Sequence, residues 1–155
     1  MVALIASLLV TAGAAAVGSL ATQSAPDFYR ELARPVWTPP AALFAPAWTA
    51  LYLLMAVAAW LVWRSPRVPA RRSALVLHAA QLALNAAWPW LFFHFRQGGW
   101  ALVDNVVLVG VVAVTVVAFW QIRPLAGALL LPYLGWVAYA AAMTAALWRA
   151  NPDLL

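Results

Sequence analysis

The chain has 155 residues, of which 67% are hydrophobic and 8% are charged. Soluble domains carry about 25% charged residues, so this chain lacks the polar groups that a water-soluble surface needs. The net charge of +5 comes from Arg residues spread over the connections between apolar runs, which disfavours nucleic-acid binding and favours lipid head groups as the counter-charge.

A helix that crosses a membrane needs about 20 apolar residues, and runs of that length bounded by Arg, Pro or Gly recur along the chain. They predict an all-α fold, an integral membrane bundle of five transmembrane helices that forms one domain over residues 1–155. The spans are predicted at about residues 2–22, 42–63, 73–95, 100–121 and 125–148. Barrel strands would alternate in hydrophobicity, and residues 106–117 do not. The first run lacks a basic start, so we interpret it as a retained helix.

The one long connection, residues 23–41, alternates aromatic and charged side chains and ends in a Pro-rich stretch. We expect it to lie over the mouth of the bundle and to cap a pocket there. An odd number of spans places the two termini on opposite sides. The connection between the second and third spans carries Arg64, Arg67, Arg71 and Arg72, but the totals of five and four Arg on the two sides leave the orientation undecided.

Polar side chains inside a membrane usually face the bundle interior, and here they fall on helical stripes with aromatic residues. The third predicted span carries His78, Gln81, Asn85, Trp88 and Phe92. The second carries Trp48, Tyr52, Met55 and Ala59, and the fifth carries Trp136, Tyr139, Ala140, Met143 and Thr144. Rise along the helices places the aromatic members in the same half of the bilayer, below the long connection. The pattern predicts a cavity lined by indoles, phenols and an amide.

Ordinary roles compete with ligand binding at several of these positions. Trp residues near span ends are typical of membrane-interface belts, as expected for Trp37, Trp60, Trp63, Trp100, Trp120 and Trp148. Trp48, Trp88 and Trp136 lie deeper. Gln81 and Asn85 could equally join helix to helix by hydrogen bonds. For His78 and His94 packing is favoured over axial haem ligation.

A single acidic residue, Asp104, falls inside a span. We expect it to reach the head groups or to pair with Arg96, in preference to a role in proton relay. Pro89 and Pro132 are expected to bend their helices. Small residues such as Gly18 would allow close contact between helices or protomers.

Catalytic motifs are missing from the sequence. It has no carboxylate pair, no nucleophile beside a base, no phosphate-binding glycine loop and no cluster of metal ligands, and it has no cysteine. Hydrolysis and phosphoryl transfer are therefore disfavoured, and no metal site is predicted.

The residues resemble the translocator protein or tryptophan-rich sensory protein family, also called peripheral-type benzodiazepine receptors. The resemblance covers nearly the whole chain. Its motifs are Phe28, Tyr29, Pro35, Trp37, Thr38, Pro39 and Pro40; Phe44, Pro46, Trp48, Thr49, Leu51 and Tyr52; Gln81, Leu82, Leu84, Asn85, Trp88, Phe92 and Phe93; and Pro132, Tyr133, Leu134, Trp136, Trp148, Arg149, Asn151 and Pro152.

The resemblance implies a membrane receptor or sensor, often a homodimer, that binds porphyrin, haem and isoquinoline-type ligands among lipids and needs no obligatory cofactor. We expect it in a bacterial cell envelope membrane. The family motifs imply pocket roles for Tyr29, Trp48, Asn85, Trp88 and Trp136. Together with the stripes, the predicted ligand-binding residues are Tyr29, Trp37, Trp48, Tyr52, Gln81, Asn85, Trp88, Phe92, Trp136, Tyr139, Ala140 and Met143.

Two other functions stay open. Some members of the family are credited with light- and oxygen-dependent porphyrin breakdown, which would involve Trp48 and Trp136, and a tetrapyrrole or sterol transporter is the other alternative. Two departures from the family bear on the site. Thr144 stands where Asn is common, and the proposed sterol pattern after Tyr139 lacks its basic residue within about five positions.

Overall fold

The computed structural model describes residues 2–23, 25–65 and 69–155, so Pro66 and Arg67 lie outside the described residues. The elements are α1 (Val2–Leu20), α2 (Ala25–Glu31), the 3₁₀ turn η1 (Ala41–Leu43), α3 (Phe44–Arg64), α4 (Pro69–Pro89), the π-helix η2 (Trp90–His94), α5 (Gly98–Ile122) and α6 (Pro124–Ala150). Every regular element of the described part is helical, which confirms the all-α prediction.

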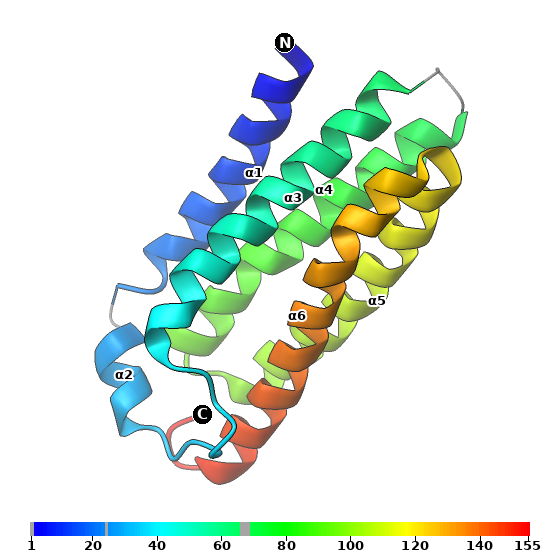
Figure 1. The fold of residues 1–155 in the computed structure, drawn as a ribbon. Coiled ribbons are helices and arrows are strands. Elements are labelled where there is room, and N and C mark those ends of the chain that lie inside the picture. Colours follow the sequence, from blue (N-terminus) through cyan, green and yellow to red (C-terminus); the bar gives the residue numbers. More distant parts are fainter. Residues whose placement is uncertain (1, 24, 66–68) are drawn as a thin grey trace.

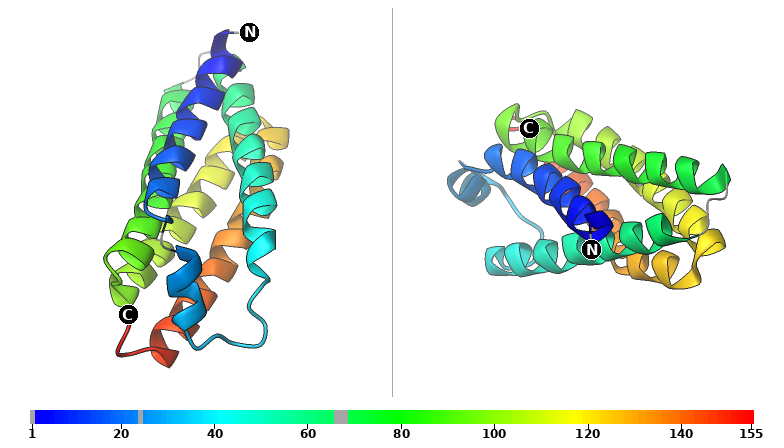
Figure 2. Two further views of the ribbon diagram at one scale, coloured as in Figure 1. Left: turned by 90° about the vertical axis from the view of Figure 1, so that its left-hand side faces the viewer. Right: turned by 90° about the horizontal axis from the view of Figure 1, so that it is seen from above.

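The long helices α1, α3, α4, α5 and α6 lie side by side along the bundle (Figure 1). Their most extensive contacts close a ring in the order α1, α3, α6, α5 and α4, and α3 also touches α4 and α5. The short helix α2 and the extended connection after it lie at the end of the bundle that also holds the C-terminus, whereas the N-terminus lies at the other end (Figures 1 and 2).

Four helices of the described part are long and apolar enough to cross a membrane, over Ala3–Leu20, Ala41–Arg64, Gly98–Ile122 and Pro124–Ala150. Helix α4 is also 21 residues long. Its hydropathy is lower because its first turn contains Arg71 and Arg72 and because it carries buried polar side chains at His78, Gln81 and Asn85.

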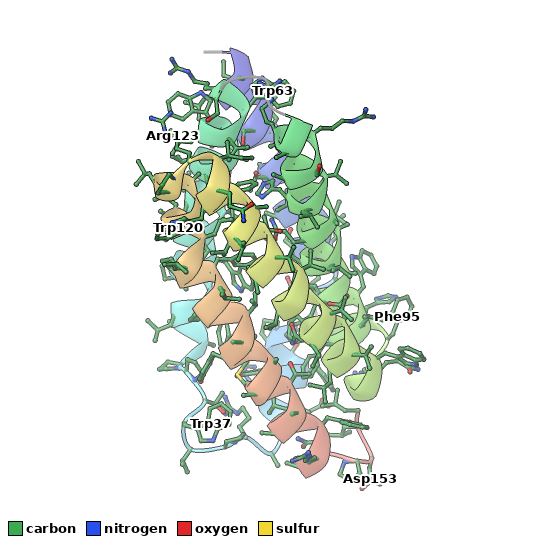
Figure 3. All side chains as sticks on the ribbon, turned by 90° about the vertical axis from the view of Figure 1, so that its right-hand side faces the viewer. Trp37, Trp63, Phe95, Trp120, Arg123 and Asp153 are labelled. Carbon is green, nitrogen blue, oxygen red and sulfur yellow. The ribbon has the colours of Figure 1, made fainter. Side chains whose placement is uncertain are left out.

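The outer surface of the bundle is apolar. Leu9, Val76 and Val106 are 68%, 60% and 59% exposed, as expected where lipid is the outer solvent. Trp63 and Trp120 lie near one end with Arg123, and Trp37 and Asp153 lie near the other (Figure 3). All three of these indoles are exposed, which agrees with membrane-interface positions.

The third predicted span changes its helical geometry near its end. It was expected over residues 73–95, but α4 begins at Pro69, and the α-helix ends at Pro89 and continues as the π-helix η2. Proline has no backbone N–H, so the ladder is interrupted there, and the Phe95 N–H then bonds to the Trp90 carbonyl at 2.8 Å. Phe92 and Phe93 of η2 contact Phe28 of α2, whereas the Trp90 indole N–H donates to the Val17 carbonyl of α1.

Two glycines lie at contacts between helices, and one of them leaves no room for a side chain. Gly18 of α1 faces Ala86 and Pro89 of α4, where a Cβ would lie 3.5 Å from the Pro89 ring, so the small-residue contact occurs within the bundle. At the turn between α5 and α6, Arg123 is extended and Pro124 starts α6. A Cβ on Gly127 would lie 2.9 Å from the Trp120 Cα, so this turn has no room for a side chain.

Candidate ligand-binding cavity

A cavity of about 740 Å³ lies within the bundle at the end covered by α2. Its walls come from α1, α2, α3, α4 with η2, α5 and α6. Of the residues predicted to bind a ligand, those that line it are Tyr29, Trp48, Tyr52, Asn85, Trp88, Phe92, Trp136, Tyr139, Ala140 and Met143. Stripes from three separate helices thus meet at one hollow.

Two half-buried indoles form the centre of the aromatic wall. The rings of Trp48 on α3 and Trp136 on α6 lie 6.3 Å apart, edge to face, with 84° between their planes. Trp48 also lies 5.5 Å from Tyr52, and Trp136 lies 6.0 Å from Phe44. Edge-to-face geometry is favourable for aromatic pairs and leaves ring faces available for a flat partner.

Asn85 on α4 joins three helices beside this wall. The Tyr52 hydroxyl of α3 donates to the Asn85 side-chain oxygen, and the Asn85 amide nitrogen donates to the Tyr133 hydroxyl of α6 at 3.1 Å. Asn85 is 5% exposed and Tyr133 is fully buried. The Asn85 amide therefore both cross-links helices and borders the cavity, which are the two roles that the sequence left open.

Replacing Asn85 with Leu should destabilise the bundle, because the Tyr52 and Tyr133 hydroxyls lose their hydrogen-bond partner. We expect a loss of about 1–2 kcal/mol in the free energy of unfolding. Thermal unfolding of the Asn85→Leu variant in detergent measures it. The control is Gln121→Ala, at an exposed position at the end of α5. If this variant lost as much free energy of unfolding as Asn85→Leu, the cross-linking role of Asn85 would be contradicted.

Two polar groups of the cavity wall have no hydrogen-bond partner in the described residues, the Tyr29 hydroxyl and the Trp88 indole nitrogen. Desolvation by burial raises the pKa of Tyr29, and the nearby Arg34 charge acts in the opposite direction. A raised pKa keeps the phenol protonated at neutral pH. Both polar atoms are buried within the wall, so neither donor is open to the hollow.

The cover of the cavity is held by aromatic packing. Phe28 of α2 is 2% exposed and contacts Phe92 and Phe93 of η2 at ring distances of 6.2 and 6.5 Å. The Arg96 guanidinium lies 4.6 Å from the centre of the Phe28 ring. Trp88 stacks on Phe92 at 5.0 Å, so the cover and the wall share one aromatic cluster.

Trp37 and Gln81 do not line the cavity, although the sequence placed both among the ligand-binding residues. Trp37 packs against Tyr139 at 5.6 Å, and its carbonyl accepts a bond from the Tyr139 hydroxyl at 2.9 Å. Gln81 lies deeper in the bundle, where its amide nitrogen contacts the Met55 sulfur and the His78 ring nitrogen. His78 stacks on Phe119, which agrees with packing in the core.

The expected environment of Asp104 is wrong. The carboxylate neither reaches the head groups nor pairs with Arg96, because its residue is 8% exposed and Arg96 lies over Phe28. One Asp104 oxygen has no partner in the part of the chain that the structure describes. The turn before α5 explains the difference, because Arg96 adopts a left-handed backbone conformation with φ 54° and its side chain lies on α2.

The sequence did not indicate that α1 and α5 also line the cavity. Ala15 and Gly18 of α1 and Asn105 and Leu108 of α5 belong to its wall. The one available signal was the polar Asn105 inside an apolar span. Its amide donates to Thr144 at 3.0 Å, so the hydrogen bond at the position where the family commonly has Asn is present with Thr.

The fold and the cavity define a class of protein, a helical membrane bundle with an aromatic hollow at one end. Comparison with known families gives the next step: residues 5–149 match the TspO/MBR family, and the chain belongs to it. It is therefore an integral membrane protein.

The relatives span animals, archaea and bacteria. The chain is 46% identical to the translocator protein of Sus scrofa over 126 residues, 80% of this chain and 75% of the relative. It is 39% identical over 141 residues to the tryptophan-rich sensory protein of Cereibacter sphaeroides, 88% and 87% of the two chains. It is 36% identical over 149 residues to the tryptophan-rich protein TspO of Archaeoglobus fulgidus, 96% of each.

Proposed function

We propose that this protein is a membrane receptor or sensor that binds tetrapyrroles, porphyrin or haem, and other flat apolar ligands in the cavity below α2. The observation that carries the proposal is the convergence of Trp48 and Trp136 on a hollow of about 740 Å³. Pockets for small molecules range over about 300–1,000 Å³, so the volume suits a ligand of this size. The resemblance to the family supplies the ligand class.

The chemistry of the wall supports the same ligand class. Indole faces bind flat conjugated rings by stacking and apolar burial. Isoquinoline-type ligands, which are also flat and aromatic, would occupy the same space.

The membrane arrangement belongs to the proposal as well. We propose that all five long helices cross the bilayer, α4 included, because its polar side chains at His78, Gln81 and Asn85 face inward and its outer residue Val76 is exposed. We also propose a homodimer, from the resemblance to the family. Cross-linking in intact membranes tests the dimer.

Titration with protoporphyrin IX in detergent micelles tests the binding function. We expect saturable quenching of tryptophan fluorescence with one site per chain, because Trp48, Trp88 and Trp136 border the ligand. Competition by an unlabelled isoquinoline-type ligand should reverse it. Quenching that rises linearly with porphyrin concentration, as it does for a soluble tryptophan derivative in empty micelles, would contradict the proposal.

A further inference from the structure

Arg34 lies at the mouth of the cavity. It follows α2 in the extended connection and lines the opening together with Tyr29. Its guanidinium carbon lies 5.0 Å from the centre of the Tyr29 ring, a distance at which the ring face attracts a cation. The side chain is thus directed across the ring that carries the free hydroxyl of the cavity wall.

The positive charge of Arg34 has no acidic partner among the residues that the structure describes. Among the described residues it forms no ion pair, whereas the neighbouring cavity residue Arg30 is bonded to Asp27 at 3.1 Å. All four acidic residues of the sequence, Asp27, Glu31, Asp104 and Asp153, lie in the described part. Arg34 therefore presents an uncompensated guanidinium at the cavity mouth.

The backbone on both sides of Arg34 is fixed. The Ala33 N–H donates to the Asn151 side-chain oxygen at 2.7 Å, and the Asn151 amide nitrogen donates back to the Ala33 carbonyl at 3.0 Å. Asn151 follows α6, is 6% exposed and also donates to the Leu147 carbonyl at 2.8 Å. On the other side, Pro35 accepts a bond from the Thr38 N–H at 3.0 Å and restricts the Arg34 backbone.

The Asn151 side-chain amide makes two hydrogen bonds with the Ala33 backbone. They join the connection after α2 to the end of α6, 118 residues away in the sequence. The packing of Phe28 would be enough to hold a connection that only covered the cavity. The additional bonds hold the residue directly before Arg34, so they determine where its side chain begins. Such preorganisation lowers the entropy lost when a flexible cation pairs with an anion.

From these contacts we propose that Arg34 forms an anion subsite at the cavity mouth, positioned by Asn151, and that the ligand is a flat apolar body with an ionised carboxylate at its rim. This inference rests on the proposed function and narrows its ligand class. The apolar body lies against Trp48 and Trp136, and the carboxylate pairs with the Arg34 guanidinium.

The test compares protoporphyrin IX, which has two carboxylates, with its uncharged dimethyl ester. We expect the wild-type protein to bind the acid about five- to tenfold more tightly than the ester, the range for a partly exposed charged hydrogen bond. The Arg34→Gln variant should bind the two with nearly equal affinity. The ratio of the two dissociation constants is compared between variants in the same micelles, so that unequal partitioning of the ligands cancels.

The matched control is Arg72→Gln, which removes a guanidinium at the start of α4, outside the cavity lining. It should keep the wild-type ratio, and the ratio should fall as salt is added to the wild-type protein. Arg30→Gln removes the other guanidinium that lines the cavity, and it tests whether the preference for the acid belongs to that residue. Loss of the preference in Arg30→Gln with its retention in Arg34→Gln would overturn the assignment to Arg34.

Asn151→Ala tests the positioning role. Amide hydrogen exchange at Ala33 in the ligand-free protein should become faster, and the acid-to-ester ratio should drop at least about twofold while the ester affinity stays close to wild type. A loss that affects acid and ester equally would indicate a structural role only and would overturn the positioning role of Asn151.

The outcomes separate the two proposals. If neither ligand binds saturably, the proposed function fails. If both bind and the acid-to-ester ratio is the same in wild type and Arg34→Gln, the anion subsite fails and the binding function stands.

Discussion

Replacing both central indoles, in a Trp48→Ala, Trp136→Ala double variant, should weaken protoporphyrin IX binding by roughly 100-fold. Each ring contributes about 1.5 kcal/mol of stacking and apolar contact to a flat ligand, and 1.4 kcal/mol corresponds to a tenfold change in the dissociation constant. The two rings lie 6.3 Å apart on different helices, so one ligand would contact both. Fluorescence of the bound porphyrin measures the affinity without relying on the removed indoles.

The control is a Trp63→Ala, Trp120→Ala double variant. These indoles are 57% and 46% exposed and lie outside the cavity. The control variant lacks the same number of tryptophans as the Trp48→Ala, Trp136→Ala variant. We expect this control variant to bind protoporphyrin IX with an affinity within about twofold of wild type, since surface changes away from a site have small effects. Unchanged affinity in a folded Trp48→Ala, Trp136→Ala variant would show that porphyrin binds elsewhere.

The largest effect on stability is expected at the turn between α5 and α6. In a Gly127→Ala variant the added methyl group would lie 2.8 Å from the Trp120 Cβ and 2.9 Å from its Cα, and backbone cannot move aside as the end of a flexible side chain can. Overpacking of this kind costs about 1–3 kcal/mol. The unfolding temperature in detergent should fall by roughly 2–12 °C for a chain of this size.

Gly110 in the middle of α5 provides the matched control. A Cβ built there meets nothing within 4 Å, so Gly110→Ala makes the same chemical change without a contact. Alanine is the better helix former by about 1 kcal/mol, and this variant should be unchanged or slightly more stable. Equal unfolding temperatures for the two variants would contradict the close packing of α5 on α6.

Features that depend on neighbouring residues along the chain were predictable. The period of the helix places Trp48 and Tyr52 on one face of their helix and Asn85 and Trp88 on one face of theirs, whatever surrounds them. The depth of each residue follows from the rise per residue and the position of the span. The inward stripes of α3, α4 and α6 could therefore be found without coordinates.

The predictions that differed depended on side chains beyond the next helical turn. Gln81 lies on the same stripe as Asn85, but the stripe extends past the cavity floor into the core, where Gln81 meets His78 and Met55. Asp104 and Arg96 are close in sequence, yet the guanidinium is attracted to Phe28 of a different element. Spacing along one helix cannot specify such partners.

By itself, the sequence determined that this protein is a helical membrane bundle with an aromatic and polar interior near one end, because hydropathy and helical period are local properties of the chain. The tertiary structure decided the ring order of the helices, the contribution of α1 and α5 to the cavity, and the contact of Asn151 with Ala33. These depend on how side chains of distant segments pack against one another. Packing is a property of the whole assembled bundle, and no single segment encodes it.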